Sequence, residues 1–243
     1  RINKQMNFYL LKGGTPVTTE EREAMVLILA ARKRVYKVLQ DLWLNEPGRE
    51  QLEALYDPDL AVAMDLLTPE GEKSLKQDLA ALYVSREDFN EEYFAGVRKN
   101  YYEMLIADRE SVYPPFATKY LPLDNDRLIE EMLTVRATYE RYGASGNKSE
   151  MEADGYLAME LSFMGRTCGL AQQAVELGVD RRAGQLLEEQ DWFLKDHLLS
   201  WVPEWIKTLR ASEKDDFYTK LANLTARFLV CDSIGLDDIS ALV

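Results

Sequence analysis

The sequence predicts an all-α fold, a single globular multi-helix bundle, and three observations support this. Apolar residues recur at intervals of three and four along most of the chain, which is the spacing of one helix face. Capping boxes of the form Ser/Thr-x-x-Glu precede two of these runs, at Thr18 and Ser149. Strand-like alternation is scarce, and 243 residues that are 47% hydrophobic suffice for one sizeable core.

The first half of the chain divides into helical runs at its Pro and Gly residues. The run after Thr18 carries apolar residues from Ala24 to Leu42 on one face and should end near Leu44, before Pro47-Gly48. Asp57-Pro58 and Thr68-Pro69 mark further breaks. The predicted helical spans are therefore 18–44, 49–66, 69–82 and about 85–106.

The second half begins with a proline-rich stretch from Ser111 to Leu123, which predicts an extended surface loop. Helical spacing returns from Leu128 to Tyr139, and Gly143 to Asn147 is the clearest linker. Ser149-x-x-Glu152 should cap a helix that runs to about Leu177. Because Gly155, Gly165 and Gly169 weaken that helix, we expect a neighbouring helix to approach it closely. We predict one domain over residues 1–243, with a hinge at 143–149.

Residues 189–205 place the single histidine of the chain on an aromatic helical face. Phe193, His197 and Trp201 follow one another at intervals of four and so share a stripe. Pro203 should end this helix near Trp201 and begin another. His197 is interpreted either as a core histidine satisfied by polar neighbours or as a residue that contacts a ligand. Glu-x-x-His pairs and histidine-rich zinc patterns are missing from the sequence, so no metal site is predicted.

Composition excludes several classes of function. The chain has 29 basic and 42 acidic residues, which argues against nucleic acid as a partner and favours either plain solubility or basic partners. No run of about 18 apolar residues occurs, so we expect no membrane-spanning helix, no secretory signal and a cytoplasmic location. Cys168 and Cys231 are isolated in apolar contexts, which is typical of reduced thiols. No Walker-type phosphate-binding loop is visible, so a nucleotide is unsupported by the sequence, and we predict no cofactor.

Two acids stand out on the helix predicted before Leu177. Glu160 lies among Leu157, Leu161 and Phe163, on or beside the apolar face, and Asp154 would join the same patch only if the helix began before it. Glu160 is either a hydrogen-bonded structural carboxylate or a groove-lining acid that meets a basic ligand.

The run Phe193-Leu194-x-x-His197-Leu198-x-x-Trp201-x-Pro203 resembles the signature of the TorD/DmsD family of molybdoenzyme maturation chaperones. Further patches occur in the family's order. The segment from Val97 to Leu105, which contains Tyr101, is followed by Pro114-Pro115 and Tyr120-Leu121, and then by Glu160-Leu161-x-Phe163-Met164 and the last helix around Phe217-Tyr218. Together these patches cover roughly residues 95 to 232.

The resemblance implies a TorD-like helical fold and a cytoplasmic chaperone, not an enzyme, that binds an oxidoreductase precursor until cofactor insertion and export. The twin-arginine signal peptide of that precursor is the implied ligand. We expect its arginines and apolar stretch to meet acids beside a hydrophobic groove. The predicted peptide-binding residues are Asp154, Glu160, His197, Trp201, Pro203, Tyr101 and Tyr120.

Two departures from the family pattern affect this placement. Gly155 follows Asp154 where the family has histidine, and Ala117 stands in a loop position where the family often has an acid. The alternatives are a scaffold that binds mature reductase without its leader, and a helical hydrolase that uses the acids and His197. The oligomeric state is expected to be a monomer or a helix-swapped dimer.

Overall fold

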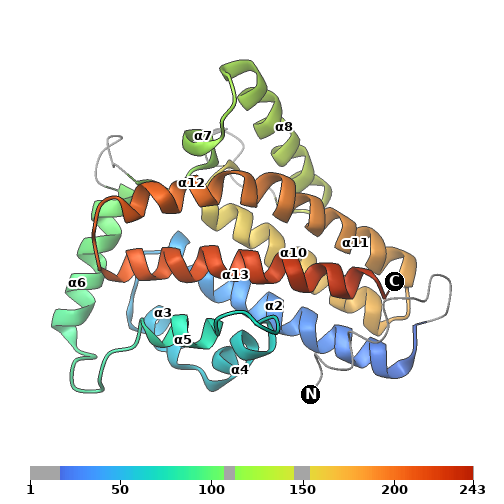
Figure 1. Ribbon diagram of the computed structural model, residues 1–243, viewed down its shortest axis with the longest axis horizontal. Helices are drawn as coiled ribbons and strands as arrows, with labels where there is room; N and C mark the ends of the chain where they lie inside the picture. The colour runs from blue at the N-terminus through green and yellow to red at the C-terminus, as the bar shows by residue number, and fades with distance from the viewer. Residues whose placement is uncertain (1–16, 107–112, 145–153, 243) are drawn as a thin grey trace.

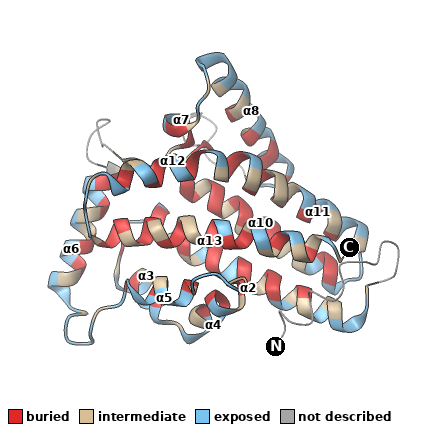
Figure 2. Ribbon diagram, in the orientation of Figure 1, coloured by how far each residue is buried: buried red, intermediate tan, exposed pale blue. Residues whose placement is uncertain are grey.

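The structure is a computed structural model that describes residues 17–106, 113–144 and 154–242 (Figure 1). Across these ranges the regular elements are helices, and the only β-type pairing is an isolated antiparallel bridge between Phe116 and Tyr156. The all-α prediction is confirmed. Buried side chains form one hydrophobic core, which Figure 2 shows along the inner faces of the long helices. None of the described helices is both long and apolar enough to cross a membrane.

The helix predicted after Thr18 is confirmed as α2, Thr19–Leu44. The capping box at its start is complete, because the Thr18 hydroxyl accepts the Glu21 amide at 3.2 Å and Glu21 Oε2 accepts the Thr18 amide at 2.8 Å. α10, Leu157–Glu176, packs along α2. Both helices bury most of their apolar residues in this contact, so together they form the central layer of the bundle.

The elements of the first half follow the predicted breaks with two corrections. α5 begins later than predicted, because Gly71 has φ +90° and the Thr68 hydroxyl accepts the Leu75 amide, which keeps 69–74 in a turn. The next helix begins at Glu91 and not near Ser85, because the Asn90 side chain caps it. The bounds are α3 Arg49–Glu53, η1 Ala54–Tyr56, α4 Pro58–Leu66, α5 Leu75–Ala80, α6 Glu91–Tyr101 and the π-helical η2 Tyr102–Ile106.

The described part of the proline-rich loop contains a one-turn helix, α7, Ala117–Tyr120. α8, Asn125–Arg141, follows it and projects from the bundle in Figure 1. The predicted cap at Ser149 lies outside the described residues. The prediction that Gly155 is helical was wrong, because α10 begins only at Leu157. The chain before α10 pairs with the loop instead: the Ala117 amide donates to the Gly155 carbonyl at 2.8 Å.

The last elements are α11, Asp180–Trp192, the π-helical segment η3, Phe193–Leu198, α12, Leu199–Arg210, and α13, Phe217–Ser240. The predicted break near Trp201 was wrong: the helix continues through Pro203. A proline ring normally clashes with the carbonyl four residues earlier. Here the wider π turns come directly before that point, and the Leu199 amide bonds back to Leu194, so the backbone register changes without ending the helix.

The close approach that was predicted for the glycines is confirmed at two of them. A Cβ at Gly165 would lie 3.3 Å from Tyr36 Cβ on α2, and one at Gly169 would lie 3.4 Å from Lys33 Cε. The missing side chains therefore let α10 lie close against α2.

Replacing Gly165 with valine should destabilise the protein by about 1–3 kcal/mol, because the branched side chain would force α10 away from α2. The matched control is Gly96→Ala in α6, where a Cβ would meet no atom within 4 Å and where alanine should stabilise the helix by about 0.5–1 kcal/mol. Urea unfolding midpoints measure both changes. Equal midpoints for the two variants would show that the helix contact tolerates a larger side chain.

A polar cluster lies in the centre of the core. Arg32 on α2 donates through Nε and Nη2 to both carboxylate oxygens of Asp232 on α13, at 2.7 and 2.9 Å. Its Nη1 donates to Gln190 Oε1 at 2.7 Å, and the Tyr36 hydroxyl donates to Asp232 at 2.6 Å. All four residues are buried. Cys168 donates to the same Gln190 oxygen, and both it and Cys231 are buried free thiols, as predicted.

Candidate functional site

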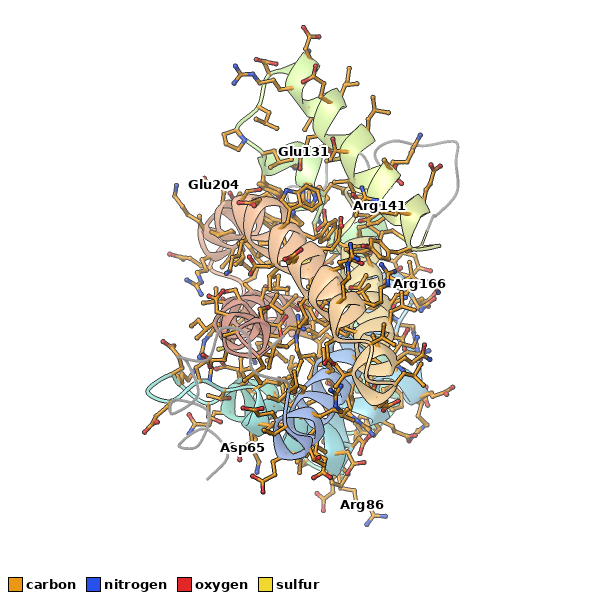
Figure 3. All side chains as sticks on the ribbon, turned by 90° about the vertical axis from the view of Figure 1, so that its right-hand side faces the viewer. Asp65, Arg86, Glu131, Arg141, Arg166 and Glu204 are labelled. Atoms are coloured by element: carbon orange, nitrogen blue, oxygen red, sulfur yellow. The ribbon has the colours of Figure 1, made fainter. Side chains whose placement is uncertain are left out.

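The only histidine is completely buried between two carboxylates. His197 on η3 bonds through Nε2 to Glu160 Oε1 on α10 at 2.8 Å, and through Nδ1 to Glu131 Oε1 on α8 at 2.7 Å. The Glu160 side chain is fully buried, whereas 26% of the Glu131 side chain is exposed. Figure 3 shows Glu131 where α8 meets the helices of the bundle. The cluster therefore joins α8 to the core.

The electrostatics of this cluster favour an imidazolium ion. Burial by itself would lower the pKa of His197, but the charge of Glu160 and the hydrogen bonds to Glu131 and Glu160 outweigh burial and raise the pKa to about 9. Burial also raises the pKa of Glu160, although His197 counteracts this. With both carboxylates ionised, the cluster carries one more negative than positive charge.

In the described ranges, three buried polar atoms of neighbouring elements have no hydrogen-bond partner: Glu160 Oε2, Trp201 Nε1 and the Tyr120 hydroxyl. The Trp201 indole is close enough to lower the pKa of Glu160, although neither Nε1 nor Oε2 has a partner at hydrogen-bond distance. The Tyr120 and Trp201 rings stack with centroids 6.1 Å apart. Buried polar atoms are normally satisfied, so this place in the fold has unused bonding capacity.

A second ion pair lies beside the first cluster. Arg136 on α8 donates through Nε to Asp154 Oδ2 at 2.6 Å, and within the described part of the chain Arg136 Nη2 is buried without a partner. Tyr139 connects the two places: its hydroxyl donates to the Asp154 carbonyl at 2.9 Å, and after burial the charges of Glu160 and Asp154 raise its pKa further. We name Glu131, Arg136, Asp154, Glu160 and His197 the α8 ionic cluster.

An apolar groove of about 400 Å³ lies between α12 and α13. Its charged lining residues are Glu72, Lys207, Arg210 and Arg227. Among the described residues, Arg210 bonds to the neutral Asn223 amide oxygen at 3.0 and 2.8 Å. The apolar walls are Leu199, Val202, Pro203, Ile206, Ala226 and Val230.

The seven residues predicted to bind peptide fall into three places. Asp154, Glu160, His197, Trp201 and Tyr120 surround the base of α8, while Pro203 is exposed in the α12–α13 groove. Tyr101 lies apart, at the far end of a buried series of ring contacts, and its hydroxyl donates to the Leu44 carbonyl at 3.4 Å. That series runs from Tyr120 through Trp201, Trp205, Trp43 and Tyr218 to Tyr101.

Sequence reasoning missed Glu131 and Arg136. Both are on the predicted helix around Leu128 to Tyr139, and each is adjacent to a buried residue, Met132 or Val135. Charged side chains beside an apolar face usually extend into solvent, so the pattern carried no sign of their partners. Those partners become visible only when α8, α10 and η3 are assembled.

The α8 ionic cluster is suited to binding cations, and the groove between α12 and α13 is suited to binding an apolar segment of polypeptide. In the part of the chain that the structure describes, no group of His, Cys, Asp and Glu is placed to hold a metal ion. The carboxylates of the α8 ionic cluster instead accept nitrogen donors, which is how proteins recognise guanidinium groups.

Comparison with known proteins decides the family. The sequence model of the family described as "Nitrate reductase delta subunit" matches residues 66–207, more than half of the chain. The chain belongs to this family. The match spans α8, α10, η3 and most of α12, and so includes every residue of the α8 ionic cluster.

Curated relatives of the chain carry the name "Chaperone protein TorD". That of Photobacterium profundum is 26% identical over 212 residues, covering 84% of this chain and 94% of the relative. The proteins of Shewanella loihica and Vibrio cholerae are 25% and 22% identical, covering 84% and 86% of this chain and 93% of each relative. No solved structure matches the chain.

The TorD-like resemblance read from the sequence is confirmed. The family is one of chaperones for molybdoenzyme maturation, which makes this chain a chaperone and not an enzyme. The hydrolase alternative is therefore set aside.

Proposed function

We propose that this chaperone acts in the cytoplasm, where it binds the twin-arginine signal peptide of an oxidoreductase precursor and holds the precursor until cofactor insertion and export. The observation that carries the proposal is the α8 ionic cluster. Its carboxylates outnumber its cations, and buried Glu160 Oε2 has no partner. An incoming guanidinium supplies the missing positive charge and several aligned N–H donors.

The apolar part of the signal peptide requires a separate surface. The α12–α13 groove offers apolar walls that include Pro203, and burial there at about 25 cal/mol per Å² would contribute most of the affinity. His197 of the ionic cluster and the α12 residues of the groove belong to one continuous helix from α11 to α12. The bound species is proposed to be a monomer or a helix-swapped dimer of the chaperone.

Neutralising the inner acids should weaken peptide binding. Glu160→Gln and Asp154→Asn each remove a charge that the arginines would meet, and we expect about a tenfold or larger rise in Kd by isothermal titration calorimetry at low salt. Affinity should also fall with added salt. Glu53→Gln, which removes an exposed carboxylate on α3 that belongs to neither the ionic cluster nor the groove, is the matched control and should bind normally.

Circular dichroism must show that the variants keep their helical content. Unchanged binding by both Glu160→Gln and Asp154→Asn would remove the acids from the site. The absence of any heat from several twin-arginine peptides with the wild-type chain would contradict leader recognition altogether.

A scaffold that binds the mature subunit remains the second candidate, because the cations that line the groove outnumber its one acid and suit an acidic surface better than an arginine-bearing leader. Lys207 is 76% exposed, and Arg210 has no acidic partner among the described residues. Pull-down of a mature reductase that lacks its leader separates the two functions. Capture that is abolished by Arg210→Glu would favour the scaffold.

A further inference from the structure

Arg136 occupies the carboxylate that a leader arginine would use. Its guanidinium contacts Asp154 through Nε to Oδ2, while Nη2 is buried and has no partner among the residues that the structure describes. The Asp154 side chain is 6% exposed and that of Arg136 is 25% exposed, so Arg136 is the more accessible partner of the pair. A one-point guanidinium contact is weaker and less directional than a bidentate one.

We infer that Arg136 is an internal substitute for one arginine of the leader, and that the leader binds by displacing it from Asp154. This inference rests on the proposed function. The second leader arginine needs no exchange, because the group formed by Glu131, His197 and Glu160 already has an excess carboxylate and the unpartnered Glu160 Oε2. One arginine position is therefore occupied by the protein's own Arg136, and the other holds no arginine but is buried, since the Glu160 side chain is 0% exposed.

The position of α8 makes this exchange feasible. The helix projects from the bundle, and it carries both Arg136 and Glu131, the two outer members of the cluster (Figure 1). The inner members, Glu160 and His197, belong to α10 and η3, while Asp154 directly precedes α10. The exchange requires α8 to move outward from the inner acids, and this movement must overcome the packing of its buried residues, of which Tyr139 contacts Phe163 and Phe193. In most molecules of the free chaperone Arg136 is then bound to Asp154, which is the closed form. The apparent affinity for the leader equals the affinity of the open form multiplied by the fraction of molecules that are open.

The test is the effect of Arg136→Gln on binding of a synthetic twin-arginine leader peptide. If Arg136 competes with the peptide, removing it should lower Kd by about tenfold, because the closed form is no longer favoured. Asp154→Asn should raise Kd in the same titration. A merely structural ion pair predicts that both substitutions weaken binding or leave it unchanged, so the opposite signs are diagnostic.

Arg141→Gln is the matched control. Arg141, labelled in Figure 3, is also on α8 and pairs with Glu189 at 2.8 Å, but both residues line a separate hollow between α8 and α11. The control should bind peptide like the wild type. Tighter binding by Arg141→Gln would show that loosening α8 anywhere is sufficient, and would overturn a specific role for Arg136.

A second measurement covers the case in which Arg136→Gln folds poorly. In the wild-type chain, saturating peptide should increase amide hydrogen exchange across Asn125–Arg141, because α8 loses its contact with Asp154. Increased protection of α8 would contradict the inference. If the wild type and Arg136→Gln both fail to bind every peptide, the proposed function itself is wrong; if both bind with the same Kd, only the competition is wrong.

Discussion

Asp232→Asn should lower the free energy of unfolding by about 3–5 kcal/mol, although the two side chains have nearly the same shape. The amide cannot neutralise Arg32, whose guanidinium is 1% exposed and is held by both Asp232 oxygens. The Tyr36 hydroxyl, which donates to Asp232, would also face an amide that is uncharged. A buried cation without its counter-ion is the main cause of the expected loss.

Asp41→Asn is the matched control, because Asp41 pairs with Lys37 on the surface of α2 and its side chain is 33% exposed. Its loss should change stability by less than about 1 kcal/mol. Urea unfolding followed by circular dichroism gives both values. A double variant, Arg32→Met with Asp232→Leu, should recover much of the stability, since it removes both charges at once. A loss below about 1 kcal/mol for Asp232→Asn would show that water reaches Arg32.

The second large effect is a dependence of stability on pH that comes from His197. Its pKa is about 9 in the folded protein, against 6.5 for the ordinary side chain. Because the folded value is the higher one, the stabilisation is fully present below pH 6.5 and is lost as pH rises through 9. The shift corresponds to about 3 kcal/mol over this window.

The measurement is the difference in unfolding free energy between the wild type and His197→Gln at several pH values. The difference should be largest near pH 6 and should shrink steadily toward pH 9, because glutamine does not titrate there. The pKa of Glu160 is also raised, so its contribution to stability is lost as pH rises too, but the loss begins at a lower pH because the ordinary pKa of this group is 4.5. Glu131→Gln removes one of the groups that raise the His197 pKa and should move the transition to lower pH. If the unfolding free energies of the wild type and His197→Gln changed in parallel with pH, His197 would not be an imidazolium in the folded protein.

Sequence patterns specified the helices well where the signals were local. The capping box at Thr18 and the break at Asp57-Pro58 depend on neighbouring residues, and both are where they were expected. Errors arose where distant contacts decide the outcome. Gly155 leaves the helical path to pair with Ala117, and the chain remains helical across Pro203 because of the π turns before it.

In the candidate site, too, the features that depend on neighbouring residues were predicted and the contacts between distant residues were not. The aromatic stripe predicted that Phe193 and His197 lie on one buried face, and the centroids of their two rings are 5.1 Å apart. The unusual position of Glu160 was also visible in the sequence. Its pairing with His197 spans 37 positions, and that of Glu131 spans 66, so no local pattern encodes either contact. The assignment of these residues to peptide binding stays a prediction.

The π turns of η3 determine which way the tryptophans of α12 face. One residue advances an α-helix by about 100°, so a single position gained or lost in η3 would rotate everything that follows by that angle. Trp201 and Trp205, now enclosed in the interior, would then swing toward solvent. The irregular backbone of η3, in the middle of this long helix, therefore lets α11 and α12 face different neighbours.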